Sequence, residues 1–371
     1  MFTFKQLISI TAIALSTANT DLYHFDTTFK PQFPSGTHTF SAVGIYQNNL
    51  YVTQRGNTSI PPVLTLSTLD GTSINAPWGA KDLEPGGAHG IAVESCHYPC
   101  ALPTDGSDPL PSLRLWVEDF TNHTLTAFTS QGKKIVQIGT AGVAGNGTAP
   151  LQFGNIADAA IASGLENPAT HTFEASHVYA TDGDGGYANR VVKINIPADG
   201  TKLPFTEWAT GHVFKNPHSI TLHKSSELLI VADREQQALK LLDSKNGDVL
   251  GTFNCGLKFG PGYGVPFGVR TLSTTIKAVN YDLLFVASMD DPQDTMYQKI
   301  SILDVSQLSS ATGVDSKCTV IQTINIDPKN YSGPHLLGVD ERTGDVYATL
   351  VADVPLSTVL RFRLNSFVEE E

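Results

Sequence analysis

Three histidines occupy matching places in the sequence, each where turn residues give way to an apolar stretch. His89 lies in Gly-Ala-His-Gly-Ile-Ala-Val, His218 in Asn-Pro-His-Ser-Ile-Thr-Leu and His335 in Gly-Pro-His-Leu-Leu-Gly-Val. Neutral imidazole is a good zinc ligand, and three imidazoles leave a coordination position open, as in catalytic zinc sites. The three residues therefore predict a zinc centre if the fold brings them together. The alternative is three unrelated loop histidines in a chain that holds 11.

A repeated unit supplies the elements that would position these histidines. Helical periodicity is nearly absent, with only residues 155–163 looking helix-like, and β-type runs alternate with Gly, Pro, Asn and Asp turns. Each unit begins with a short apolar strand and continues with a second strand of the type Leu-x-Val-x-Asp, as in 115–119 and 229–233. Copies start near Ala42, His89, Asp158, His218, Phe267 and His335.

Six such units of four strands each predict an all-β fold, a six-bladed β-propeller. The first strand of each blade lines the central channel. The histidines then belong to blades two, four and six, so they alternate round one axis. The alternative is an irregular β-sandwich in which the similarity of the segments is accidental.

Two arginines follow the second strands of blades one and four. Arg55 lies in Val-Thr-Gln-Arg-Gly and Arg234 in Val-Ala-Asp-Arg-Glu. Guanidinium groups grip carboxylates through paired hydrogen bonds, so the two residues could bind an anionic substrate at the channel mouth. The alternative for Arg234 is a surface ion pair with its neighbours Asp233 and Glu235.

Tyr187 occupies the matching turn of blade three. A phenol close to a dication can lose its proton and act as a base. The alternative is a turn tyrosine that packs on its own blade. The preceding Asp182-x-Asp184 begins like a calcium loop, but its later ligands are missing.

The first residues predict export. Lys5, an apolar run over 7–15 and small residues at 16–18 describe a signal peptide over residues 1–18, and a buried first strand is the alternative. Residues 19–371 then form a single propeller, without a membrane anchor, that is secreted to the extracellular space. Sequons begin at Asn57, Asn122, Asn146 and Asn330, which predicts a glycoprotein.

Cysteine content and charge fit this interpretation. Four cysteines suit an oxidising compartment; a bridge between Cys96 and Cys100 is plausible and leaves Cys255 with Cys318, but all three pairings stay open. Charged residues make up only 16% of the chain, the net charge is −12, and no basic run occurs. Nucleic acid is therefore not an expected partner.

The histidine segments, together with Val-Ala-Asp-Arg-Glu at 231–235 and Tyr-Ala-Thr-Asp-Gly at 179–183, resemble peptidyl-α-hydroxyglycine α-amidating lyase. This family is an NHL-repeat six-bladed propeller, and the likeness runs patchily from about residue 40 to residue 364. It implies His89, His218 and His335 as ligands of a catalytic Zn²⁺. It also implies Arg55 and Arg234 around the substrate carboxylate and hydroxyl, with Tyr187 as base.

The implied reaction splits a small peptide substrate, a peptidyl-α-hydroxyglycine, into a peptide amide and glyoxylate. A separate copper monooxygenase would be the partner that supplies this substrate. Two positions depart from the family: Leu336 replaces an Asp that serves a structural Ca²⁺, and Ala188 replaces a bridged Cys. Calcium is therefore not expected here.

Two other functions remain open. A non-catalytic NHL-repeat propeller would bind protein or glycan partners through its faces, and the two departures favour it. A propeller hydrolase of the lactonase type would hold axial calcium with carboxylates and Asn, whereas this chain offers axial histidines.

Overall fold

The computed structural model describes residues 21–36, 39–56, 58–95, 113–164, 166–167, 172–173, 175–197, 204–289, 298–309, 317–328, 331–351 and 358–365. The expected signal peptide, Cys96, Cys100, Asn57 and Asn330 lie outside these ranges. Within them, no helix is long and apolar enough to cross a membrane.

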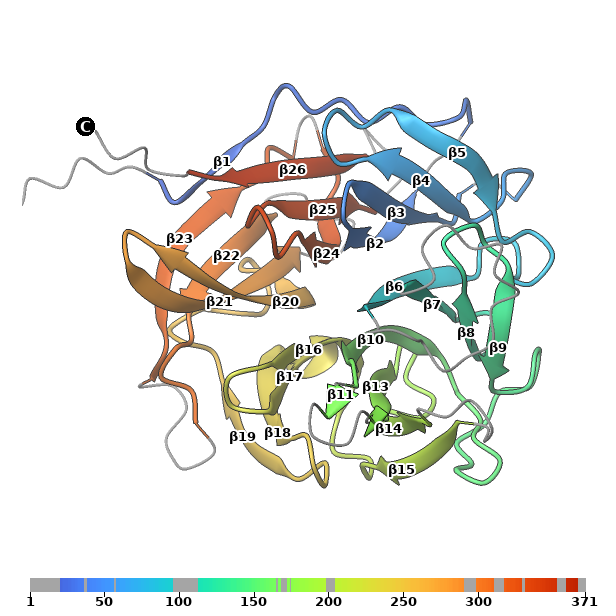
Figure 1. Ribbon diagram of the computed structural model, residues 1–371. Helices are drawn as coiled ribbons and strands as arrows, with labels where there is room; N and C mark the ends of the chain where they lie inside the picture. The colour runs from blue at the N-terminus through green and yellow to red at the C-terminus, as the bar shows by residue number, and fades with distance from the viewer. Residues whose placement is uncertain are drawn as a thin grey trace, which may run out of the picture.

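Six four-stranded antiparallel sheets stand round a central axis, so the expected six-bladed propeller is confirmed (Figure 1). Blade one comprises β2 (Phe40–Tyr46), β3 (Asn49–Gln54), β4 (Val63–Ser67) and β5 (Ser73–Trp78). Blade two comprises β6 (Ala88–Ser95), β7 (Leu113–Asp119), β8 (Thr124–Phe128) and β9 (Lys134–Ile138). Blade three comprises β10 (Ile156–Ala162), β13 (Ser176–Asp182), β14 (Arg190–Ile196) and β15 (Phe205–Ala209), with the small hairpin β11 (Glu166–Asn167) and β12 (Thr172–Phe173) beside it.

The remaining blades complete the ring. Blade four comprises β16 (Pro217–His223), β17 (Leu228–Asp233), the short 3-10 helix η1 (Arg234–Gln236), β18 (Ala238–Asp243) and β19 (Val249–Phe253). Blade five comprises β20 (Val265–Ile276), β21 (Val279–Met289), β22 (Lys299–Asp304) and β23 (Thr319–Asn325). Blade six comprises β24 (Pro334–Val339), β25 (Val346–Leu350), β26 (Val359–Leu364) and β1 (Tyr23–Phe25).

The inner strands β2, β6, β10, β16, β20 and β24 face the axis (Figure 1), and all six repeat starts predicted from the sequence fall in them. Residues 155–163 are not helical, because β10 occupies Ile156–Ala162. The alanines that made this stretch look helical are also suited to an inner strand. Inner strands crowd together at the axis, and small side chains such as Ala157 and Ala159 fit there fully buried.

The ring is closed by the strand nearest the N-terminus. β1 pairs antiparallel with β26 as the outermost strand of blade six, with Tyr23 opposite Leu364 and Phe25 opposite Phe362. Arg361 of β26 donates hydrogen bonds to the Asp26 carboxylate, which follows β1 directly. Segments from the two ends of the chain therefore share one sheet.

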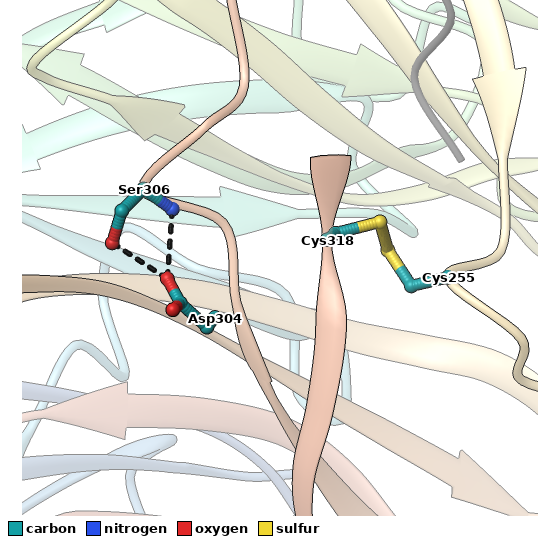
Figure 2. Close-up of a disulfide and its surroundings, with 4 residues drawn as sticks. All are labelled: Cys255, Asp304, Ser306 and Cys318. Carbon is teal, nitrogen blue, oxygen red and sulfur yellow. Dashed lines mark hydrogen bonds between the residues drawn. A yellow bond between two sulfur atoms is a disulfide. The ribbon is translucent and has the colours of Figure 1, made fainter. Parts of the chain in front are cut away.

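A disulfide joins Cys255 to Cys318, so one of the open pairings is now settled among the described residues (Figure 2). Cys255 follows β19, the outer strand of blade four, and Cys318 precedes β23, the outer strand of blade five. The bridge thus ties two adjacent blades at their outer edges. Near it, the Asp304 carboxylate accepts hydrogen bonds from the amide and hydroxyl of Ser306 (Figure 2).

A cavity of about 1070 Å³ lies on the axis. It is lined by the later parts of the inner strands, including Val43, Ile91, Ala160, Ile220, Arg270 and Val339. The three histidines stand at the starts of these strands and do not line it. The axis therefore has two distinct ends, one with the histidines and one with the cavity.

Candidate metal centre

The three histidines meet on the axis. One ligand atom from each of His89, His218 and His335 lies within 4.8 Å of the other two, and all three residues are buried. Their ring centroids are 4.8 to 5.2 Å apart. The sequence prediction that alternate blades bring them together agrees with this geometry.

A β-bulge near the start of each inner strand explains how the side chains reach the axis. The pairing between inner and second strands shifts at Ala88/Gly90 in blade two and at Pro217/Ser219 in blade four, skipping His89 and His218. In blade six the shift between Pro334 and Leu337 includes His335. A bulged residue leaves the ladder, which re-aims its side chain and frees its backbone groups.

The same bulge in the other three blades supplies hydrogen-bond acceptors. Nδ1 of His89 lies 2.7 Å from the carbonyl oxygen of Ala157, the bulged residue of blade three. Nδ1 of His218 lies 2.8 Å from the Phe267 carbonyl, and Nδ1 of His335 lies 2.7 Å from the Ser41 carbonyl. Since a carbonyl can only accept, each Nδ1 carries the proton and the lone pair of the neutral ring is on Nε2. Each ring is thereby oriented as a metal-binding imidazole is.

Close packing preserves this ring of contacts. A Cβ added at Gly90 would lie 2.7 Å from the Ala157 carbonyl oxygen, the atom that accepts from His89. A Cβ at Gly268 would lie 2.5 Å from the His335 carbonyl oxygen. Both glycines directly follow a bulged residue, so the backbones can approach only where a side chain is missing.

Buried aspartates at the ends of second strands hold the loops that lead into the histidines. Asp233 accepts the amides of Lys215 at 3.1 Å and Asn216 at 2.8 Å, just before His218. Asp119 accepts the Glu84 amide at 2.6 Å in the loop before His89. The final Asp of the Leu-x-Val-x-Asp pattern is therefore a positioning residue. Asp233 therefore has a buried role in place of the surface ion pair with Arg234 that was the alternative.

Burial disfavours the charged form of His218 and of His335. Desolvation lowers the pKa of His218 to about 3, with Asp184 opposing the shift. Desolvation, followed by the neighbouring His218 and His89, lowers the pKa of His335 well below its ordinary value. Nε2 of His89 and of His218 is buried and has no hydrogen-bond partner among the described residues. Buried ring nitrogens without a hydrogen-bond partner, gathered within 4.8 Å of one another, are what a bound cation would satisfy.

Arg55 and Arg234 occupy equivalent places at the rim of this site. The Arg55 amide donates to the Thr39 carbonyl and the Arg234 amide to the Asn216 carbonyl, which pins each turn beside the start of its inner strand. The Arg55 guanidinium lies 4.7 Å from the Phe120 ring centre, and the Arg234 guanidinium 5.1 Å from that of Phe267.

These two phenylalanines connect the arginines to the histidines. The Phe120 ring lies 6.0 Å from His89, and the Phe267 ring 5.1 Å from His218. Each arginine is thus stacked over a ring that itself contacts a histidine. Cationic groups positioned in this way over aromatic faces are held in a fixed orientation.

Asp184 reaches the centre from the turn of blade three. Its Oδ2 lies 3.2 Å from Nε2 of His89, and its Oδ1 lies 3.2 Å from a guanidinium nitrogen of Arg234. Arg234 also pairs with Glu235 at 3.0 Å, which is the neighbour contact expected from the sequence.

Two sequence-predicted positions stand apart from the centre. Tyr187 is 57% exposed, and its ring covers Gly154, where an added Cβ would lie 2.6 Å from Cδ1. Among the described residues, no contact joins Tyr187 to the histidines, so its role as base stays a prediction. Leu336 is fully buried in the apolar core beside Ala42 and Ile91.

Sequence reasoning missed several residues around the axis. Directly below the histidines, Arg270 pairs with the buried Asp158 through contacts of 2.7 and 2.8 Å, and the Ser219 hydroxyl donates to the same carboxylate at 2.6 Å. Burial, followed by the charge of Asp158, raises the pKa of the nearby Glu118 well above its ordinary value. The available signal was the presence of acidic residues inside apolar strands.

The geometry defines a six-bladed propeller with three axial histidines, and comparisons with known proteins agree with that class. The chain is 28% identical over 348 residues to NHL repeat-containing protein 3 of Homo sapiens, covering 91% of this chain and 83% of that protein. The corresponding Mus musculus protein is 28% identical over 330 residues, covering 86% and 78%. These relatives support the NHL-repeat propeller family.

Other comparisons bear on the fold alone. No family model matches the chain. A solved structure of RRP9 WD40 repeats superposes with a TM-score of 0.51 at 10% identity, covering 92% of this chain and 100% of that one. WD40 repeats also form propellers, so this likeness supports the architecture.

Proposed function

We propose that this chain is a secreted zinc-dependent lyase that cleaves peptidyl-α-hydroxyglycine to a peptide amide and glyoxylate. Zinc binding is supported by the convergence of three buried imidazoles, whose Nδ1 atoms all donate to backbone carbonyls. Lyase activity is supported by the resemblance of the motifs around these histidines to the amidating family.

The donor set fits zinc. Nε2 of His89, His218 and His335 would hold the ion, and backbone carbonyls fix the ring orientation as outer ligands do in known zinc sites. When bound, zinc supplies a Lewis acid for the α-hydroxyl oxygen of the substrate.

The residues at the rim would bind and orient the substrate. Arg234 and Arg55 carry the positive charge that a glycine-derived carboxylate needs, and their stacking on Phe267 and Phe120 fixes their direction. In the reaction the hydroxyl proton leaves, the carbonyl of glyoxylate forms, the C–N bond breaks and the amide nitrogen takes a proton. Tyr187 is the proposed acceptor of the hydroxyl proton, which requires its ring to turn from Gly154 toward the histidines.

Glyoxylate release from a peptidyl-α-hydroxyglycine tests this function. The zinc-loaded protein should release glyoxylate, and Arg234→Ala should lower kcat/KM by about 100-fold, since it removes a partly buried partner of the substrate carboxylate. Arg342→Ala is the matched control, because Arg342 pairs with Asp340 on the cavity side and should leave kcat/KM unchanged. Zinc-loaded, folded protein that releases no glyoxylate above the uncatalysed rate would refute the lyase.

One observation favours the second candidate, a non-catalytic propeller that binds protein or glycan partners. The Asp184 carboxylate already lies between Arg234 and His89, where the carboxylate of a substrate would bind. If this contact persists in solution, the histidine cluster is a structural centre. The glyoxylate assay separates the two functions.

A further inference from the structure

We propose that Asp184 is the fourth ligand of the tri-histidine centre, which makes the resting site a closed His₃Asp set. This inference rests on the zinc site of the proposed function and adds a residue to which the family resemblance assigns no role. It concerns coordination and is independent of whether the lyase reaction takes place.

Nε2 of His89 and the Asp184 carboxylate meet beside the other two histidines. Nδ1 of His89 donates a hydrogen bond to the Ala157 carbonyl, which leaves Nε2 as the ring nitrogen available to a ligand. Oδ2 of Asp184 lies 3.2 Å from this Nε2, which has no hydrogen-bond partner among the described residues. A buried nitrogen and a carboxylate oxygen this close form an arrangement that a shared cation satisfies.

The spacing of these two atoms fits a metal site. In a tetrahedral zinc site with bonds of about 2.0–2.1 Å, neighbouring ligand atoms are roughly 3.3 Å apart. The 3.2 Å between Asp184 Oδ2 and His89 Nε2 matches this edge. The carboxylate therefore stands at the distance of one ligand–ligand edge from His89.

Neighbouring residues hold the Asp184 carboxylate in place. The amides of Gly183 and Asp184 both donate to the Asn155 carbonyl, at 3.0 and 3.1 Å, which fixes the backbone of the turn. Gly183 packs against Pro217, since an added Cβ would lie 2.2 Å from its Cδ. Arg234 then donates to the second oxygen, Oδ1, at 3.2 Å. Ligating carboxylates are characteristically held by such outer hydrogen bonds.

A closed set has a consequence for access to the ion. With three imidazoles and a carboxylate in place, a tetrahedral ion has no position for an external anion. If the lyase reaction occurs, the substrate must displace Asp184 from both the ion and Arg234. An α-hydroxy acid can do so, because it presents a carboxylate to the arginine and an oxygen to the metal.

Cobalt substitution with azide as the external anion tests the proposal. The Co²⁺ absorption spectrum of the wild-type protein should not change on azide titration. Asp184→Ala should give a spectrum that azide shifts, with a Kd for Co²⁺ raised at least about 10-fold by the missing ligand. Glu235→Ala is the matched control: it removes the other carboxylate on Arg234, is exposed, and should remain insensitive to azide.

Each other outcome overturns the proposal in a distinguishable way. A wild-type cobalt spectrum that azide shifts would mean an open tri-histidine site, which refutes the role of Asp184 and leaves the lyase intact. An Asp184→Ala spectrum that azide leaves unchanged would mean that another group fills the position. Folded protein that binds no Co²⁺ would refute both the fourth ligand and the zinc centre, and Asp184→Asn with circular dichroism guards against a misfolded variant.

Discussion

At the residue scale, the centre depends on an alternation that runs round the whole ring. Histidines stand at the bulges of blades two, four and six, and Ala157, Phe267 and Ser41 offer carbonyls at the bulges of blades three, five and one. Every histidine therefore finds its acceptor in the next blade. The sequence predicted the histidines from their shared context. It could not predict the acceptors, because every residue type has a backbone carbonyl.

Asp233 gives a test of how the second strand positions a ligand. Asp233→Asn removes the charged acceptor of the Lys215 and Asn216 amides and should loosen the loop before His218. We expect the zinc affinity to fall about 10- to 100-fold, as for the loss of other outer-shell partners. A competition titration with a zinc chelator measures this change.

The control for this variant lies in the same blade. Asp243→Asn removes the acceptor of the Lys245 amide at the opposite end of β18, away from the histidines. Its zinc affinity should equal that of the wild type. An equal loss in both variants would show a general destabilisation of blade four and would contradict the positioning role of Asp233.

At the element scale, the blade is the unit that the sequence predicts best. The Leu-x-Val-x-Asp runs and the strand starts follow from period-two burial and turn residues, so inner and second strands were found in all six blades. The closing strand β1 was missed because three residues carry too little pattern. The strand β10 looked helix-like because its crowding at the axis selects alanine, a strong helix former.

Closure of blade six predicts a pH-dependent stability. Burial opposes ionisation of Asp26, but hydrogen bonds from Thr28 and Arg361 outweigh it and lower its pKa from 3.8 to about 2. Because the folded pKa lies below the unfolded value, this stabilisation is present above pH about 4 and is lost as the pH falls toward 2. Asp26→Asn should therefore lower the free energy of unfolding by at most about 2 kcal/mol at pH 7.

Urea unfolding of both proteins at pH 7 and at pH 2.5 measures this effect. The difference between wild type and Asp26→Asn should shrink at the lower pH. Asp21→Asn, an exposed residue of the same terminal segment, should match the wild type throughout. A difference that stays constant with pH would contradict the ionic contribution and leave only lost hydrogen bonds.

At the scale of the whole molecule, the six-fold arrangement turns residues far apart in the chain into one site. His89 belongs to blade two and His335 to blade six, yet their ring centroids lie 4.8 Å apart. Further along the inner strands, Arg270 pairs with Asp158 and lines the cavity. Sequence repeats could predict the convergence of the histidines. They could not predict that Asp184 reaches in from its turn, since turn conformation depends on contacts with a neighbouring blade.

In the proposed centre, three alternate blades each contribute one ligand to a single zinc ion, which elemental analysis can detect. The purified wild-type protein should contain about one zinc ion per chain. His89→Ala, His218→Ala and His335→Ala should each lose it, while His212→Ala, which changes an exposed histidine close in sequence to His218, should retain it. Folded wild-type protein without stoichiometric zinc, or metal that survives removal of any one of the three axial histidines, would rule out a zinc ion held by these three residues.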